Sequence, residues 1–459
     1  MTLSVFDAAR EQPRREAVVV GEVVLDYATL AEQVRAVMDE VDRACVGRDV
    51  GHPVALVARP ALREVLLTLA LIELRWPWLA LHSRLTEGER ARLVRLAGAQ
   101  WLIDGTSIQE LPWTAPASQL APDTIAVLAT SGTTGRPKLA MLPRRAWVAS
   151  AEASGANLGW REDDRWLLCM PLAHVGGLSV VTRCVHARRA VVLMDDGRFG
   201  ADAVIEAVER RRVTLLSVVP TMLHRMLARS PSWAPPRWLR AILLGGAAAS
   251  PLLLRRAAAA GWPILTTYGL TEACSQVTTQ RYGTTQQGEA GEGVVLEGVE
   301  VSVDDGRVLV RGSTMMSGYL GEAAPFDAEG WFATGDCGRW DDAGNLHILG
   351  RRTDLIVTGG ENVYPAEVEA ALEECPGVSA ACVFGVPDEE WGQLVAAAVV
   401  GTVTVASIAQ FAAERLAPHK RPRLVSICGD LRWTASGKLD RAATARAAVS
   451  GLRRADSSA

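Results

Sequence analysis

The sequence lacks long apolar runs and a marked excess of either charge. No apolar run approaches the roughly 18 residues needed to span a bilayer, and the first residues contain no apolar stretch of the kind found in a secretory signal. We therefore expect no membrane insertion. The formal net charge is only −4, so we also expect no nucleic-acid partner.

The eight cysteines are scattered and form no CxxC pair. This spacing argues against a zinc site and against a disulfide framework. Reduced thiols in a cytoplasmic protein are the simplest interpretation. Internal repeats and low-complexity tracts are missing as well.

The 459 residues exceed what one hydrophobic core usually holds, because single cores stop growing near roughly 250–300 residues. Strand-like apolar runs alternate with amphipathic segments between about residues 50 and 270, which predicts a parallel, doubly wound sheet. We predict an α/β fold whose large N-terminal domain has doubly wound sheets and a small β unit, followed by a smaller, mobile α+β domain. The predicted boundaries are 1–350 for the large domain, 351–353 for a hinge and 354–459 for the small C-terminal domain.

The strongest local signal is the segment TSGTTGRPK, which follows a predicted strand. Small residues let backbone N–H groups approach phosphate oxygens, hydroxyls add donors, and a lysine adds charge. The segment is not a Walker A motif, because it contains no Gly-Lys-Ser/Thr. A flexible turn is the alternative interpretation. The candidate phosphate contacts are Thr130, Ser131, Gly132, Thr133, Thr134, Gly135 and Lys138.

Together with four further motifs in the same order, this loop resembles the adenylate-forming superfamily, which includes acyl-CoA ligases, luciferases and adenylation domains. The resemblance runs from about residue 15 to 445. The other motifs are Tyr268–Glu272, Trp331–Asp336, Gly350–Asp354 with Gly359–Asn362, and Thr434–Asp440.

The resemblance implies a two-step reaction. A carboxylic acid is adenylated by ATP with Mg²⁺, and its acyl group then passes to coenzyme A, with release of pyrophosphate and AMP. The expected partners are small molecules, and a homodimer is left open.

The motifs suit this chemistry. Glu272 offers a hard oxygen ligand for Mg²⁺, and Asp336 can accept hydrogen bonds from ribose hydroxyls. The ammonium of Lys438 can stabilise the charge that develops when a carboxylate attacks the α-phosphorus. The resemblance implies catalytic roles for Lys438, His174, Thr271 and Glu272, and ATP or AMP contacts at Gly246, Ala247, Tyr268, Gly269, Thr271, Asp336 and Arg351.

Several residues are candidates for the acid pocket. The resemblance implies that His174 gates the pocket, although a lone histidine is more often a core residue. Arg183, on a predicted helix, could bind a second carboxylate in bidentate fashion, and an ordinary helix-surface arginine is equally open. The other candidates for the acid pocket are Gly245, Ser275 and Gln276. For each of these residues a role in a turn or in the core is equally open.

Within the superfamily, the segments 167–185, 218–227, 267–277 and 350–369 most resemble ligases that act on an aromatic keto-dicarboxylate in menaquinone biosynthesis. The alternatives are another aryl- or acyl-CoA ligase, an aryl-adenylating enzyme that loads a carrier protein, and an inactive member that serves as a scaffold.

Two positions depart from the family pattern. Leu139 follows the phosphate loop where Gly or Ala is usual, and the hinge residue is Thr353 rather than Asp or Lys. Coenzyme A contacts are expected at Gly359 and Gly360.

Overall fold

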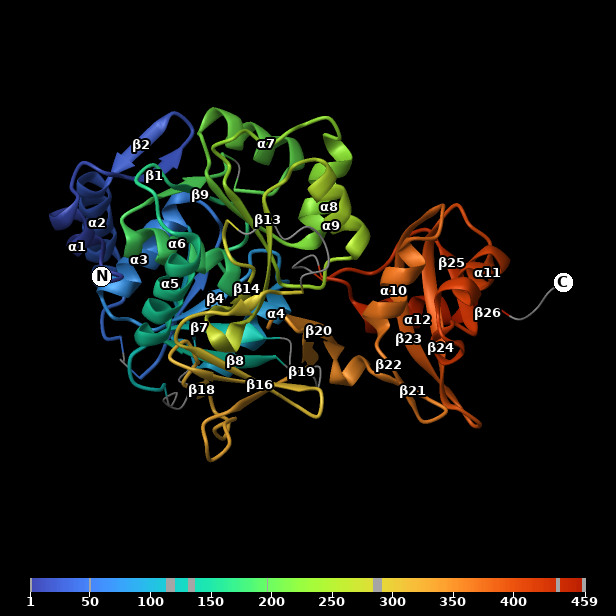
Figure 1. Ribbon diagram of the computed structural model, residues 1–459. Helices are drawn as coiled ribbons and strands as arrows, with labels where there is room; N and C mark the ends of the chain where they lie inside the picture. The colour runs from blue at the N-terminus through green and yellow to red at the C-terminus, as the bar shows by residue number, and fades with distance from the viewer. Residues whose placement is uncertain are drawn as a thin grey trace.

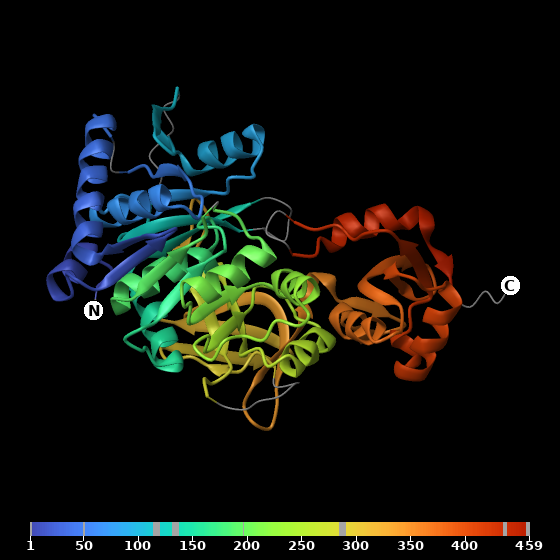
Figure 2. The same cartoon turned by 90° about the horizontal axis from the view of Figure 1, so that it is seen from above.

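The computed structural model of the protein describes residues 2–48, 51–112, 120–130, 137–195, 197–283, 291–434 and 438–455. The chain forms two bodies that lie side by side (Figures 1 and 2). The large unit extends to the end of β20 (Leu346–Arg351), and the small unit begins at β21 (Ile356–Thr358).

The first sheet of the large unit has nine strands in the order β15-β14-β13-β12-β11-β9-β10-β1-β2. The six strands from β13 to β1 pair in parallel, as expected from the strand–helix alternation. Antiparallel strands close both edges. The strands are β1 (Glu16–Val20), β2 (Val23–Asp26), β9 (Arg165–Leu168), β10 (Ala190–Leu193), β11 (Leu215–Val218), β12 (Ala241–Leu244), β13 (Ile264–Leu270), β14 (Ser275–Thr279) and β15 (Val294–Val295).

The second sheet has seven strands in the order β18-β8-β7-β4-β3-β5-β6. Its centre is parallel and its edge pairs are antiparallel, so the expected doubly wound fold class is confirmed. The parallel pairing predicted from the strand–helix alternation holds for the central strands of both sheets and not for their edges. Short connections explain the antiparallel pairs β1–β2, β5–β6, β7–β8 and β13–β14, because a hairpin can only join antiparallel strands. The strands are β3 (Val54–Val57), β4 (Trp78–Leu81), β5 (Trp101–Asp104), β6 (Ser107–Glu110), β7 (Thr124–Thr130), β8 (Lys138–Pro143) and β18 (Gly318–Tyr319).

Helices of the large unit pack against the sheets and bury their apolar faces in separate hydrophobic clusters (Figure 1). Pro220 and Pro251 occupy first helical positions, where the missing N–H has no intrahelical acceptor to lose. Among the described residues, no helix is both long and apolar enough to cross a membrane. The helices are α1 (Val5–Glu11), α2 (Tyr27–Ala44), α3 (Leu62–Glu73), α4 (Glu87–Ala97), α5 (Arg144–Leu158), α6 (Val175–Ala187), α7 (Ala201–Arg210), α8 (Pro220–Arg229) and α9 (Pro251–Ala259).

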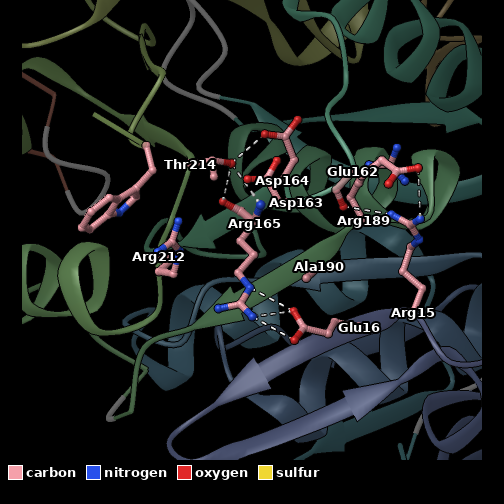
Figure 3. Close-up of a pocket in the computed structure, with 11 residues that line it drawn as sticks. Arg15, Glu16, Glu162, Asp163, Asp164, Arg165, Arg189, Ala190, Arg212 and Thr214 are labelled. Carbon is pink, nitrogen blue, oxygen red and sulfur yellow. Dashed lines mark hydrogen bonds and ion pairs between the residues drawn. The ribbon is translucent and has the colours of Figure 1, made fainter. Parts of the chain in front are cut away.

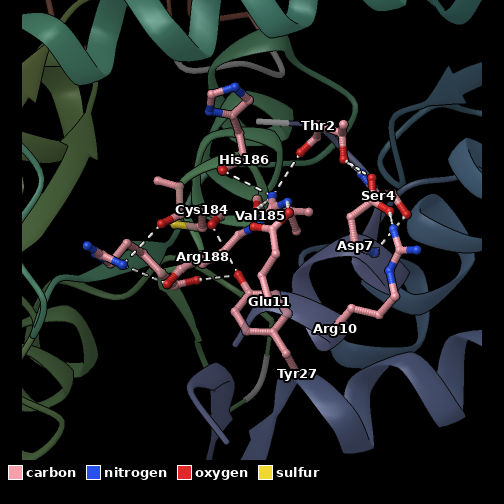
Figure 4. A network of polar contacts seen from close by, with 12 residues as sticks. Thr2, Ser4, Asp7, Arg10, Glu11, Tyr27, Cys184, Val185, His186 and Arg188 are labelled. Atoms are coloured by element: carbon pink, nitrogen blue, oxygen red, sulfur yellow. Dashed lines mark hydrogen bonds and ion pairs between the residues drawn. The ribbon is translucent and has the colours of Figure 1, made fainter. Parts of the chain in front are cut away.

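The N-terminal segment holds the C-terminal end of α6 in place (Figure 4). The buried guanidinium of Arg188 pairs with Glu11 at 2.9 Å and donates to the carbonyl of Thr2 at 2.9 Å. The Tyr27 hydroxyl donates to the carbonyl of Arg189 at 2.9 Å. Because α6 begins directly after His174, these contacts also hold the helix that positions the candidate gate.

A small antiparallel sheet completes the large unit, as predicted, and the small unit has hydrophobic cores of its own. The small sheet contains β16 (Val299–Asp304), β17 (Arg307–Gly312), β19 (Phe332–Trp340) and β20. The other elements of the small unit are β22 (Glu361–Val363), β23 (Val378–Asp388), β24 (Gly392–Gly401), β25 (Leu424–Cys428), β26 (Arg453–Arg454), α10 (Pro365–Glu373), α11 (Val405–Arg415) and α12 (Arg441–Ala448).

Candidate active site

Small residues follow the carboxyl end of β12, where the large unit meets Lys438 of the small unit. A side chain on Gly245 would lie 2.7 Å from the Thr267 methyl group, so only glycine fits there. Gly246 has φ near 80°, and a side chain there would lie 3.9 Å from Cε of Lys438. The turn at Gly246, a predicted ATP contact, and the predicted catalytic lysine therefore face each other across the two units.

Lys438 belongs to the small unit, and its side chain reaches this position at the boundary with the large unit. Its backbone N–H donates to Oγ1 of Thr434 at 3.1 Å. The lysine side chain is accessible to solvent, but the protein around it desolvates the ammonium and lowers the pKa of Lys438. Arg351 lowers this pKa further, whereas Asp336 and Glu272 oppose the change, so all three charges lie near the ammonium.

Asp336 is the centre of a buried polar group. Its Oδ2 accepts a hydrogen bond from the Tyr268 hydroxyl at 2.7 Å, and its Oδ1 pairs with Nε of Arg351 at 2.7 Å. Burial raises the pKa of Asp336, and Arg351 opposes that rise. A carboxylate offers about four lone-pair sites, so Asp336 can still accept hydrogen bonds from a ribose.

Glu272 lies in a 3-10 turn, η1 (Thr271–Ala273), directly after β13. Its Oε1 accepts a hydrogen bond from the Tyr319 hydroxyl at 2.7 Å. No cluster of three or more His, Cys, Asp or Glu side chains suited to a metal occurs in the described part of the chain. One half-buried carboxylate fits a magnesium ion that is held mainly by substrate phosphates and water.

The predicted phosphate loop falls between two strands. Ser131, Gly132, Thr133, Thr134 and Gly135 lie outside the described residues, but both ends of the loop are defined. Thr130 at the end of β7 pairs with Lys138 at the start of β8 in an antiparallel ladder, so the loop connects a hairpin and no helix follows it directly. Leu139 is buried in β8, which explains the departure from the small residue expected there.

A second histidine accompanies His174. The ring centroids of His82 and His174 are 5.3 Å apart, and Nε2 of each is buried with no hydrogen-bond partner among the described residues. Nδ1 of His82 accepts the N–H of Arg84 at 3.0 Å, so neutral His82 carries its proton on Nε2. Burial, His82 and Lys438 lower the pKa of His174 to about 4, so both rings are neutral near pH 7.

Arg183 is fully inside the protein. It lies on α6, 2% exposed, with its guanidinium carbon 5.6 Å from the centre of the Trp166 ring. Its Nε and Nη2 have no hydrogen-bond partner within the described ranges. Burial lowers the pKa of Arg183 to about 10, so the group is still a cation near pH 7. The alternative of a helix-surface arginine is therefore wrong.

The chain after Glu272 is strained. Cys274 and Ser275 have φ of 49° and 103°, which non-glycine residues rarely adopt. A side chain on Gly269 would lie 1.9 Å from the carbonyl oxygen of Ser275, so glycine is needed there. Oε1 of Gln276 is buried without a partner among the described residues. Strain and an unpaired acceptor close to Glu272 are typical of a functional site.

The remaining predicted residues are less central. Thr271 is half-buried in η1, and Ala247 is exposed after β12. Thr353 is exposed in a 3-10 turn, η2 (Arg352–Asp354), between the two units. Gly359 and Gly360 form the β21–β22 turn of the small unit, where Gly359 packs against the Trp391 ring.

A cavity of about 300 Å³ lies elsewhere, at the amino ends of β9, β10 and β11 (Figure 3). Two of its charged side chains form ion pairs: Arg165 makes a bidentate pair with Glu16, and Asp164 pairs with Arg240 at 2.6 Å. Ligands of open α/β sheets bind at the opposite, carboxyl ends of the strands. We therefore interpret this cavity as part of a structural network.

The sequence analysis missed His82 and Tyr319. His82 directly follows a buried strand of the second sheet, and this position alone could have marked it as a candidate. No local sequence pattern could have marked Tyr319. It comes close to Glu272 because β18 pairs with β8, a strand that is distant in the sequence.

Known proteins share this architecture and these motifs. The AMP-binding enzyme family matches residues 105–320, and the AMP-binding enzyme C-terminal domain matches residues 367–438. A 2-succinylbenzoate–CoA ligase from Bacillus licheniformis is 40% identical over 334 residues, which cover 70% of this chain and 69% of that enzyme.

Two solved structures of o-succinylbenzoate coenzyme A synthetase from Bacillus subtilis are similar at 30% identity. The complex with ATP and a magnesium ion has a TM-score of 0.86 and covers 96% of this chain and 98% of that one. A double mutant bound with the product analogue OSB-NCoA has a TM-score of 0.70 and covers 97% and 98%.

The chain belongs to the AMP-binding enzyme family. Within this family it is an ATP-dependent, AMP-forming acid–CoA ligase, which confirms the enzyme class expected from the sequence.

Proposed function

We propose that the protein adenylates o-succinylbenzoate and then forms its coenzyme A thioester, as one step of menaquinone biosynthesis. The relatives named for this acid support the proposal. The observation that carries the choice of acid is the buried, unpaired guanidinium of Arg183, since an isolated buried charge is costly unless a ligand pairs with it. The second carboxylate of o-succinylbenzoate is such a partner.

In the first half-reaction, a carboxylate oxygen bonds to the α-phosphorus of ATP and the bond to pyrophosphate breaks. Lys438 stabilises the developing charge on the phosphate, and Asp336 holds the ribose. Glu272 would hold Mg²⁺, which neutralises the charge of the triphosphate. The phosphate loop, from Thr130 to Lys138, cradles that triphosphate.

The acid lies beside α6 in this proposal. His174 and His82 form one wall of the acid pocket. Each neutral imidazole can donate one hydrogen bond to the acid and carries no full charge that would attract or repel it. Gly245, Ser275 and Gln276 lie toward the nucleotide, and Arg183 lies deeper along the helix.

In the second half-reaction, sulfur of coenzyme A bonds to the acyl carbon and the bond to AMP breaks. Lys438 occupies the space beside Gly246, so the small unit must move before the thiol can enter. We propose domain boundaries at 1–350 and 354–459, with rotation about Thr353. The TM-score is 0.86 against the complex with ATP and magnesium and 0.70 against the double mutant with the product analogue, although both chains are 30% identical to this one. This difference supports two arrangements of the units.

After that rotation, the Gly359–Gly360 turn would face the pantetheine arm. ATP and coenzyme A are cytoplasmic metabolites, and we place the reaction there. Light scattering would decide whether the protein forms the homodimer that the sequence leaves open.

The direct test is mass spectrometry of products from ATP, Mg²⁺, coenzyme A and one acid at a time. We expect AMP, pyrophosphate and the o-succinylbenzoyl thioester. Benzoate, a fatty acid and an acyl carrier protein serve as the comparison arms. A product with benzoate or with the carrier protein, and none with o-succinylbenzoate and coenzyme A, would contradict the proposal.

Replacing Arg183 with alanine should raise the KM for o-succinylbenzoate about ten- to a hundredfold, because hydrogen bonds to charged groups contribute about 1.5–3 kcal/mol. The ATP affinity should not change. Steady-state kinetics measure both quantities, with benzoate as an acid that has no second carboxylate for Arg183 to bind.

The matched control is Arg225→Ala, on the exposed face of α8, which should leave both constants unchanged. A normal KM for o-succinylbenzoate in the Arg183→Ala enzyme would remove the main support for this acid.

A further inference from the structure

Residues 315–322, here called the bridging segment, connect the two halves of the nucleotide site. Met316 N–H donates to the carbonyl of Glu272 at 2.8 Å. Ser317 N–H donates to Met141 at 2.9 Å, and Leu320 N–H donates to Leu139 at 2.8 Å, both on β8. The segment is thus held both by the turn that carries the metal carboxylate and by the strand that leaves the phosphate loop.

Tyr319 is the side chain through which this segment acts. It is 8% exposed, and its hydroxyl donates to Oε1 of Glu272 at 2.7 Å. The phenol hydroxyl is the donor of this hydrogen bond, and the Glu272 carboxylate is its acceptor. Oε2 of Glu272 has no hydrogen-bond partner in the described parts of the chain.

The same ring supports the other side of the site. The ammonium of Lys138 lies 4.7 Å from the centre of the Tyr319 ring, and it pairs with Glu322 of the same segment at 2.7 Å. A cation at this distance from an aromatic face is attracted to it. One tyrosine therefore contacts both the metal carboxylate and the lysine at the end of the phosphate loop.

We propose that Tyr319 is a positioning residue for the magnesium–ATP step: its hydroxyl holds Oε1 of Glu272, so that Oε2 is presented to the metal. The inference rests on the proposed function. Groups that orient a metal ligand in this way typically change metal affinity by about 10–100-fold when removed. The thioester step should not need Tyr319, because the triphosphate has already left.

The test compares the Tyr319→Phe variant with the wild type. Phenylalanine removes the hydroxyl and keeps the ring beneath Lys138. Calorimetry measures ATP affinity with Mg²⁺ and with EDTA, and the Mg²⁺ dependence of pyrophosphate release is measured in parallel. We expect the gain in ATP affinity from Mg²⁺ to shrink about tenfold or more, while affinity in EDTA and thioester formation from preformed acyl-adenylate stay unchanged.

The control is Tyr282→Phe, which removes a hydroxyl that accepts a hydrogen bond from Arg161 outside the site, and this variant should behave as the wild type does. A double-mutant cycle with Glu272→Gln separates positioning from a general structural role. If Tyr319 acts through Glu272, the Tyr319→Phe change has no further effect on the magnesium gain in that background.

An unchanged magnesium gain in Tyr319→Phe, or an equal loss in both backgrounds, would overturn the inference. Absence of adenylation by the wild-type protein would instead overturn the proposed function, so the two failures are distinguishable.

Discussion

Lys438→Ala is expected to slow adenylate formation about 10²–10³-fold, while thioester formation from preformed acyl-adenylate continues near the wild-type rate. Loss of one electrostatic contact to a transition state typically has this magnitude. The structure places the ammonium beside Gly246, close to the charges of Asp336, Arg351 and Glu272, where the α-phosphate would lie. Pyrophosphate release and thioester formation, measured separately, check the prediction.

Lys420→Ala is the matched control for this variant. Lys420 belongs to the same small unit and pairs with Glu367 at 2.5 Å. Its replacement should affect neither half-reaction. Equal losses in the two half-reactions of Lys438→Ala would show that this lysine does not act only in adenylation.

Thr353→Pro should uncouple the two half-reactions, with pyrophosphate formed and thioester formation abolished. Proline fixes φ near −65°, which is within the range of a 3-10 helix, and Thr353 lies in such a turn. The ring therefore suits the arrangement seen here, in which Lys438 faces the large unit. A rotation about residue 353 would require a backbone change that proline does not permit.

Thr353→Ala removes the hydroxyl but leaves φ free, so this control should support both half-reactions. Both variants would be examined after their folded state is verified by circular dichroism. Wild-type rates for both half-reactions in Thr353→Pro would place the pivot elsewhere.

Local sequence patterns were sufficient to predict features that depend on residues close together in the chain. The alternation of apolar runs and amphipathic segments predicted the sheets of the large unit, and the glycine-rich loop, the turn at Glu272 and the segment at Lys438 were each visible in a few consecutive residues. The enzyme class was implied by the resemblance of these ordered motifs to the adenylate-forming superfamily.

The burial of a side chain cannot be predicted from such local patterns. Arg183 was equally consistent with a pocket lining and with an exposed helix face, since one position on a helix does not reveal what packs over it. The structure excludes the exposed alternative by burying the guanidinium against Trp166, without a partner among the described residues. The antiparallel edges and the hairpin around the phosphate loop likewise depend on which strands become neighbours.

The sequence by itself determined the fold class, the ligase class and the identity of Lys438, Glu272 and Asp336 as candidates, because periodicity and short motifs are properties of neighbouring residues. Only the tertiary structure brought Tyr268 to Asp336 across 68 positions of the chain, and Tyr319 to Glu272 across 47. Such pairs form when sheets and loops pack to bury apolar surface and satisfy buried polar groups. No local pattern records which distant side chain will then supply the hydrogen bond.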